Sequence, residues 1–147
     1  MTVGYATANG SATAGTDYAL TSGTLTFTPG QTTRTISVPV AGDAVIEASE
    51  TFTVGLSGAV NATIARATGT GTITNDDFPA LSINNVAVAE GDAATAGAVF
   101  TVSLSAGAPF GVAIDYATAN GTATASSDYT PQAGNLAFAA GQTSRTF

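Results

Sequence analysis

The chain has 147 residues, of which 44% are hydrophobic and only 9% are charged, and its formal net charge is −7. It contains no Cys, His or Lys, which excludes disulfides, Cys nucleophiles, Ser-His-Asp triads, Schiff bases and the usual zinc sites. The acidic balance also argues against a nucleic-acid partner, because no basic stripe is present to displace phosphate counterions. No apolar run approaches the roughly 20 residues that a membrane helix needs, so we expect no direct membrane insertion.

Short stretches in which Thr or Ser alternates with Val, Leu, Ile or Phe predict β-strands, and no helical periodicity competes with them. The expected strands of the first half are residues 3–7, 24–28, 34–40, 51–56 and 68–74, with a hairpin across 24–40 at the turn Pro29-Gly30-Gln31. Those of the second half are 81–83, 86–89, 98–105, 112–118 and 135–138. The larger apolar residues are the predicted core: Leu25, Phe27, Ile36, Val38, Phe52, Val54, Leu56, Ile73, Phe100, Val102 and Leu104.

One block of the sequence occurs twice. Residues 5–36 read YATANGSATAGTDYALTSGTLTFTPGQTTRTI, and residues 116–147 read YATANGTATASSDYTPQAGNLAFAAGQTSRTF. The spacing of about 110 residues is that of a whole β-sandwich domain and is too long for a solenoid unit. We therefore expect the chain to be a segment of a tandem array, with the boundary between two domains at the polar, proline-ended stretch 75–79. Residues 1–78 would be the C-terminal portion of one repeat, and residues 79–147 the N-terminal portion of the next.

The chain has few charged residues. Most of the acidic ones fall in loops that the alternating direction of the strands places at one end of each repeat. Successive antiparallel strands alternate in direction, so loops two strands apart share an end. This count gathers Asp17, Asp43, Glu47, Glu50, Asp76 and Asp77 in the first repeat, and Glu90 and Asp128 in the second. Converging carboxylates repel one another unless protonated or joined by a cation. Oxygen ligands without His or Cys favour Ca²⁺ over a transition metal.

Other interpretations of the same residues stay open at this point. Asp17 suits an Asx-turn beside Tyr18, and the acids from Asp43 to Glu50 suit a solvated loop. Three classes of function follow: a calcium-binding repeat, a metal-free structural spacer, and an enzyme with paired carboxylates that act as in glycoside hydrolysis. The enzyme is disfavoured because no aromatic sugar platform accompanies the acids.

Taken together, the motifs resemble the Calx-beta domain family. They cover almost the whole chain and read YATANGSATAGTDY, GTLTFTPGQTTRTISVPV, GDAVIEASETF, ATGTGTITNDD and SINNVAVAEGDAATAGAVFTVSLS. The resemblance implies an immunoglobulin-like antiparallel β-sandwich, here as two partial tandem domains without enzymatic activity. It also implies calcium ligands at Asp17, Asp43, Glu47, Glu50, Asp76, Asp77, Glu90 and Asp128. Gly42, Ala44 and Asn75 stand where the richest calcium-binding members have further aspartates, so we expect one or two ions.

The expected function is that of a calcium-binding structural and adhesive repeat in a large extracellular or cell-surface protein, with calcium rigidifying the junction between repeats. Neighbouring repeats of the same chain are expected partners, as are cell-surface or matrix ligands. Residues 78–80 reach only about 10 Å, whereas a returning strand would begin about 20 Å away. We therefore expect that residues 81–105 do not complete the first repeat, and predict either two partial sandwiches or an exchange of strands between molecules.

Overall fold

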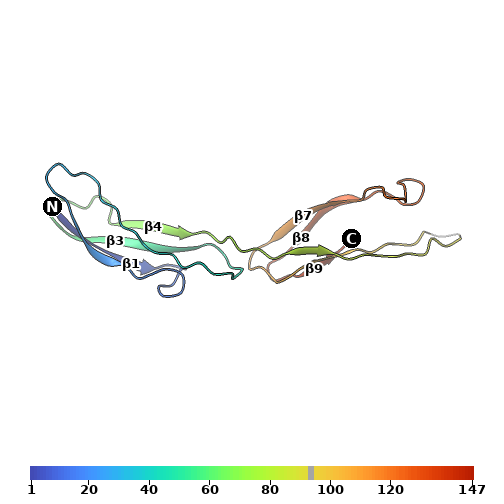
Figure 1. Ribbon diagram of the computed structural model, residues 1–147, viewed down its shortest axis with the longest axis horizontal. Helices are drawn as coiled ribbons and strands as arrows, with labels where there is room; N and C mark the ends of the chain where they lie inside the picture. The colour runs from blue at the N-terminus through green and yellow to red at the C-terminus, as the bar shows by residue number, and fades with distance from the viewer. Residues whose placement is uncertain (93–94) are drawn as a thin grey trace. The chain divides into compact units, whose positions relative to one another are not determined.

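The computed structural model describes residues 1–92 and 95–147. These residues divide into two compact units, Met1–Asp76 and Asp77–Phe147 (Figure 1). Every strand pair in them is antiparallel, which confirms the predicted all-β class. Nowhere in the described ranges is a helix long and apolar enough to cross a membrane.

The first unit contains one four-stranded sheet with the order β2-β1-β3-β4. Its strands are β1 (Thr2–Asn9), β2 (Ser22–Thr26), β3 (Glu50–Val60) and β4 (Thr68–Ile73). The core forms where Phe52 of β3 meets Ala12 and Tyr18 of the loop after β1. The rings of Tyr18 and Phe52 stack with their centroids 4.5 Å apart, and Tyr18 is only 1% exposed. The loop after β1 is therefore part of the core.

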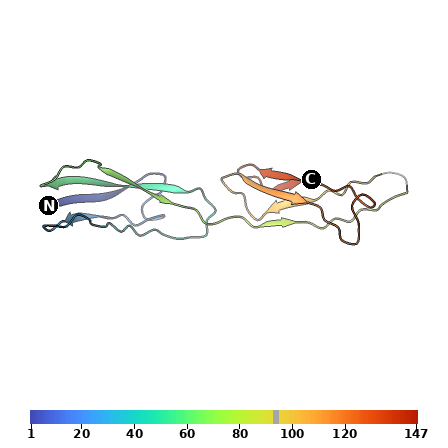
Figure 2. The ribbon, with the colours of Figure 1, turned by 90° about the horizontal axis from the view of Figure 1, so that it is seen from above.

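The second unit contains two sheets, β5-β6-β9 and β7-β8 (Figure 2). Its strands are β5 (Leu81–Ile83), β6 (Thr101–Leu104), β7 (Val112–Ala117), β8 (Ala133–Phe138) and β9 (Ser144–Thr146). Val102 and Leu104 of β6 pack against Leu136 and Phe138 of β8, and all four side chains are buried. The two sheets thus meet through side chains that alternate along each strand.

Two predicted strands are wrong. Within the described ranges, residues 34–40 pair with no strand and make only an isolated bridge between Tyr18 and Val40. Residues 86–89 also lie outside every strand. Both segments have the right residue alternation, but a strand also needs a neighbour whose backbone groups complete its hydrogen bonds.

The predicted hairpin across residues 24–40 is wrong for the same reason, although its turn is present. Gln31 N donates to Thr28 O at 3.0 Å, and Gly30 has φ of 81°, a left-handed conformation that favours glycine. In the second unit, the matching turn at Gln142 joins β8 to β9, which belong to different sheets. This motif therefore passes the chain from one sheet to the other.

Candidate metal centre

The loop after β1 closes on itself through two polar side chains. Asn9 Oδ1 accepts hydrogen bonds from Ala14 N at 2.9 Å and from the Tyr18 hydroxyl at 2.7 Å. Asp17 Oδ2 accepts one from Thr13 N at 2.6 Å. Since Tyr18 is buried, these bonds fix the loop to the core and hold the Asp17 carboxylate in place.

The second unit repeats this arrangement. Asn120 Oδ1 accepts from Ala125 N at 2.8 Å and from the Tyr129 hydroxyl at 2.7 Å, and Asp128 Oδ2 accepts from Thr124 N at 2.7 Å. The Thr124 N–H, followed by its hydroxyl, lowers the pKa of Asp128. Asp17 and Asp128 each accept a bond from the N–H four residues earlier, which is not the Asx-turn considered for Asp17, so each carboxylate closes its own loop.

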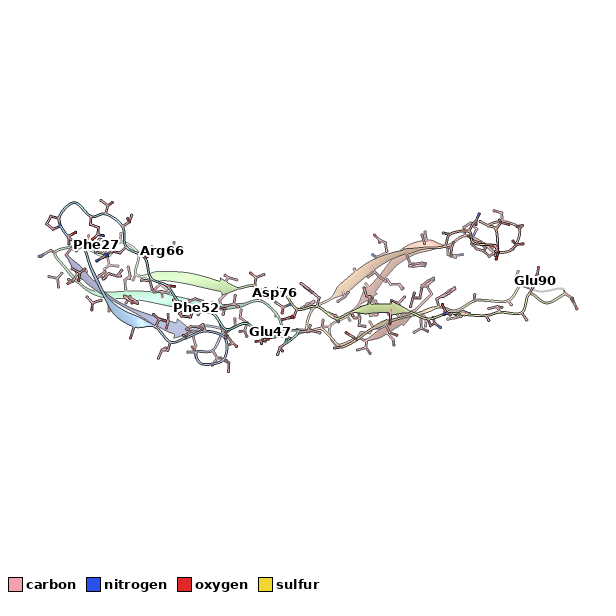
Figure 3. All side chains as sticks on the ribbon, viewed as in Figure 1. Phe27, Glu47, Phe52, Arg66, Asp76 and Glu90 are labelled. Carbon is pink, nitrogen blue, oxygen red and sulfur yellow. The ribbon has the colours of Figure 1, made fainter. Side chains whose placement is uncertain are left out.

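Two further loops reach the Asp17 end of the first unit. Ala41 N donates to Asp17 O at 2.9 Å, which brings the segment before Asp43 beside the first loop. Glu47 N donates to Asn75 Oδ1 at 3.4 Å, so the loop before β3 meets the segment that follows β4. Figure 3 shows Glu47 and Asp76 at this end of the unit.

Glu50 and Asp17 form the electrostatic centre of this cluster. Burial raises the pKa of Glu50, and the charge of the neighbouring Asp17 raises it further, followed by the charges of Glu47 and Asp43. The Thr13 N–H lowers the pKa of Asp17, against the effect of its own burial. Glu50 Oε2 is buried and has no hydrogen-bond partner among the described residues. A buried carboxylate oxygen without a donor, next to a second carboxylate, is an arrangement that a bound cation relieves.

The remaining acids lie farther from such a centre. Asp43 is exposed, and its Oδ1 accepts from Val45 N at 2.7 Å in an Asx-turn. Asp76 is exposed in the first unit, while Asp77 belongs to the second. Glu90 and the loop that carries Asp128 lie toward the same end of the second unit (Figures 1 and 3). Over residues 1–92 and 95–147, no three Asp, Glu, His or Cys side chains are grouped closely enough to hold a metal ion.

Sequence reasoning missed the asparagines of this region. Asn9 and Asn120 organise the acidic loops, and Asn75 joins two of them. The available signal was the duplicated pattern itself, since both copies keep an Asn nine residues before the Tyr of the Asp-Tyr pair. An Asn that bonds both a loop N–H and a Tyr hydroxyl explains that spacing.

The antiparallel sheets and the acidic loops at one end of the first unit define a modular β-sandwich repeat. The Calx-beta domain family profile matches residues 1–77 and again residues 74–147. The chain therefore belongs to the Calx-beta domain family, as its motifs indicated.

Relatives share part of this chain. Sodium/calcium exchanger 3 of Homo sapiens is 46% identical over 57 residues, which are 39% of this chain and 6% of the exchanger. Sodium/calcium exchanger 1 of Canis lupus familiaris is 44% identical over 55 residues, which are 37% of this chain and 6% of that protein. The matched segment is thus a small fraction of either exchanger.

Solved structures resemble almost the whole chain. The crystal structure of the calcium binding domain CBD12 of CALX1.1 superposes on 99% of this chain and on 60% of the solved chain, with a TM-score of 0.53 and 25% sequence identity. The crystal structure of CBD12 from CALX1.2 covers 99% of this chain and 61% of the solved chain, with a TM-score of 0.53 and 28% sequence identity. The antiparallel β-sandwich expected from the sequence is confirmed.

Proposed function

We propose that this chain is a calcium-binding Calx-beta module, and that its function is binding rather than catalysis. The observation that carries the proposal is Glu50 Oε2, which is buried without a donor beside the Asp17 carboxylate. The proposed ligands remain the eight carboxylates expected from the sequence: Asp17, Asp43, Glu47, Glu50, Asp76, Asp77, Glu90 and Asp128.

The chemistry of the first unit fits calcium. Calcium takes six to eight oxygen ligands in flexible geometry, and carboxylate and amide oxygens both serve. Asp17 and Glu50 supply carboxylates, and Asn75 Oδ1 lies at the same meeting of loops. Two carboxylates that repel each other at one meeting of loops, with no donor for Glu50 Oε2 among the described residues, favour a cation between them over glycoside hydrolysis.

Calorimetric titration with calcium, alongside thermal unfolding in calcium and in chelator, tests the proposal. Free calcium at 100 times the dissociation constant should stabilise the chain by about 2.7 kcal/mol. Glu50→Gln should weaken binding, whereas Asp115→Asn, an exposed acid on β7, is the matched control and should leave it unchanged. No heat and no stabilisation at millimolar calcium would sink the proposal. A stability that is unchanged or raised by Asp43→Asn with Glu47→Gln would favour the metal-free spacer instead.

We further propose that the module serves as an adhesive repeat in an extracellular or cell-surface protein, and that calcium orders the segment after Asn75 and so stiffens the passage into the next repeat. The tandem copies support this role, because neighbouring repeats and surface or matrix ligands are natural partners of such arrays. The affinity distinguishes the settings, since extracellular modules bind calcium at about 10⁻⁴–10⁻³ M and intracellular sensors at about 10⁻⁷–10⁻⁵ M. A sensor-range affinity would contradict the extracellular assignment.

A further inference from the structure

Each repeat carries an Asn-Gly pair at the start of its acidic loop, at Asn9-Gly10 and again at Asn120-Gly121. In such a pair the backbone nitrogen of the glycine reaches the side-chain amide carbon of the asparagine readily, because glycine has no Cβ to hinder the approach. All four residues are exposed to water. Each pair therefore combines an internal nucleophile, an amide carbon and access for the water that hydrolysis consumes.

The surroundings of both asparagines activate the same amide group. Asn9 Oδ1 accepts a hydrogen bond from Ala14 N at 2.9 Å and another from the Tyr18 hydroxyl at 2.7 Å. In the second copy, Asn120 Oδ1 accepts the same two kinds of bond, and Tyr129 supplies the hydroxyl. Two donors on one carbonyl oxygen make its carbon more electrophilic and stabilise the negative charge that develops on the oxygen during attack.

The loop holds the oxygen of each amide and not its nitrogen. Both bonds at Asn9 end on Oδ1, and so do both bonds at Asn120. Loss of Nδ2 therefore leaves the two bonds of each loop in place, and a carboxylate oxygen at the same position accepts them more strongly than an amide oxygen does.

We propose that Asn9 and Asn120 are self-modifying sites, at which the folded loop promotes deamidation. Hydroxide removes the proton of the glycine nitrogen, this nitrogen forms a bond to Cγ of the asparagine, and the bond from Cγ to Nδ2 breaks. The departing nitrogen takes up a proton from water and leaves as ammonia, and a succinimide ring remains. Water then opens the ring. Cleavage of the bond between Cγ and the glycine nitrogen gives Asp, and cleavage between that nitrogen and the main-chain carbonyl carbon gives isoaspartate.

Each conversion changes the charge of its repeat. It adds one negative charge to a chain whose net charge is already −7. In the first repeat, the new carboxylate lies in the loop that also carries Asp17. Because calcium favours carboxylate oxygens, calcium affinity should increase as the protein ages, a consequence that rests on the proposed calcium function.

Peptide mapping by mass spectrometry measures the conversion at each asparagine. The folded chain and the chain unfolded in urea are incubated in the same mildly alkaline buffer with chelator. If the two donors activate the amide, Asn9 and Asn120 should convert faster in the folded chain than in the unfolded one. A loop that only restrains its asparagine would have the opposite effect, so slower or equal conversion of either site in the folded chain overturns the proposal.

Tyr18→Phe and Tyr129→Phe are a matched pair of variants for the role of the hydroxyl. Tyr18→Phe removes one donor from Asn9 Oδ1, so conversion at Asn9 should slow by about three- to tenfold, the factor that one neutral hydrogen bond contributes. Asn120 is the internal control in the same molecule, and Tyr129→Phe should reverse the two results. Circular dichroism confirms that each variant is folded. An unchanged or raised rate at Asn9 in folded Tyr18→Phe would contradict the activation by its hydroxyl.

Asn9→Asp supplies the product for the calcium measurement. Calorimetric titration should show tighter calcium binding than in the parent, whereas Asn61→Asp, which adds the same charge after β3 and away from Glu50, should not. If the parent binds no calcium, the proposed function fails, while the deamidation rates still decide the modification. If the parent binds calcium and Asn9→Asp binds it no more tightly, the expected increase in affinity is wrong.

Discussion

The Phe52 ring stacks on Tyr18 and also lies over the bare backbone of Gly71, its partner across β3 and β4. A Cβ atom at Gly71 would meet Phe52 Cζ and would lie 2.6 Å from Cε1 and 2.9 Å from Cε2, well inside the 3.4 Å at which ordinary contact begins. Gly71→Ala therefore requires the ring to move. The ring cannot retreat without disturbing the stack with Tyr18.

The cost follows from those contacts. Overpacking a well-packed core costs about 1–3 kcal/mol, and a lost aromatic stack costs about 0.5–1.5 kcal/mol. We expect Gly71→Ala to lower the free energy of unfolding by about 2 kcal/mol. Gly69→Ala is the matched control, because it lies on the same strand and face and a Cβ there meets nothing within 4 Å. It should be neutral or stabilise by about 0.4–1 kcal/mol through the unfolded state.

Urea unfolding of the parent and both variants measures the difference, with midpoints compared at a shared slope. Equal midpoints for Gly71→Ala and Gly69→Ala would refute the reasoning, since the two substitutions differ only in the ring above Gly71. A changed slope for one variant would show instead that compactness, and not packing alone, had altered.

Further predictions concern the acidic cluster and its loop. In chelator, stability should fall as the pH rises through and above the ordinary Glu50 pKa of 4.5, because the folded state raises that pKa and so holds the proton more tightly. Asp17, whose folded pKa is lowered, should lose its contribution as the pH falls through 3.8 and below. Thermal unfolding across this range should show the first effect vanish in Glu50→Gln while the second persists; an unchanged profile would contradict the assignment. Tyr18→Phe removes the hydroxyl that donates to Asn9 at 2.7 Å and should cost about 1 kcal/mol by urea midpoint. A midpoint equal to that of the parent would mean that this bond contributes nothing net.

The alternation of apolar and polar residues was sufficient to predict core residues where a segment both faces the core and pairs with a neighbouring strand. Phe52, Val102 and Leu104, all predicted as core, are 7%, 4% and 6% exposed. Residues 34–40 alternate equally well and form no strand, because pairing depends on another segment whose presence one stretch of sequence does not reveal. Leu25 and Phe27 are half-buried for the same reason.

The site was predictable only to the level of its loops. The alternating direction of the strands was sufficient to place the loops of Asp17 and Glu47 at the same end of the unit. It does not indicate which oxygen atoms lie in contact. The closeness of Asp17 to Glu50 and the role of Asn75 depend on side-chain positions set by packing. The proposed ligands therefore remain a hypothesis for titration to test.

The self-closed loop from Asn9 to Tyr18 has a consequence for folding kinetics. Its side-chain bonds join residues at most nine positions apart, whereas β1 must find β3 across more than 40 residues. Contacts between near neighbours in sequence form faster than distant ones, because less chain entropy is lost in closing them. In an array of nearly identical repeats, distant strands risk pairing with the wrong copy. A loop that assembles from its own residues fixes the end of one strand in each repeat before that choice is made.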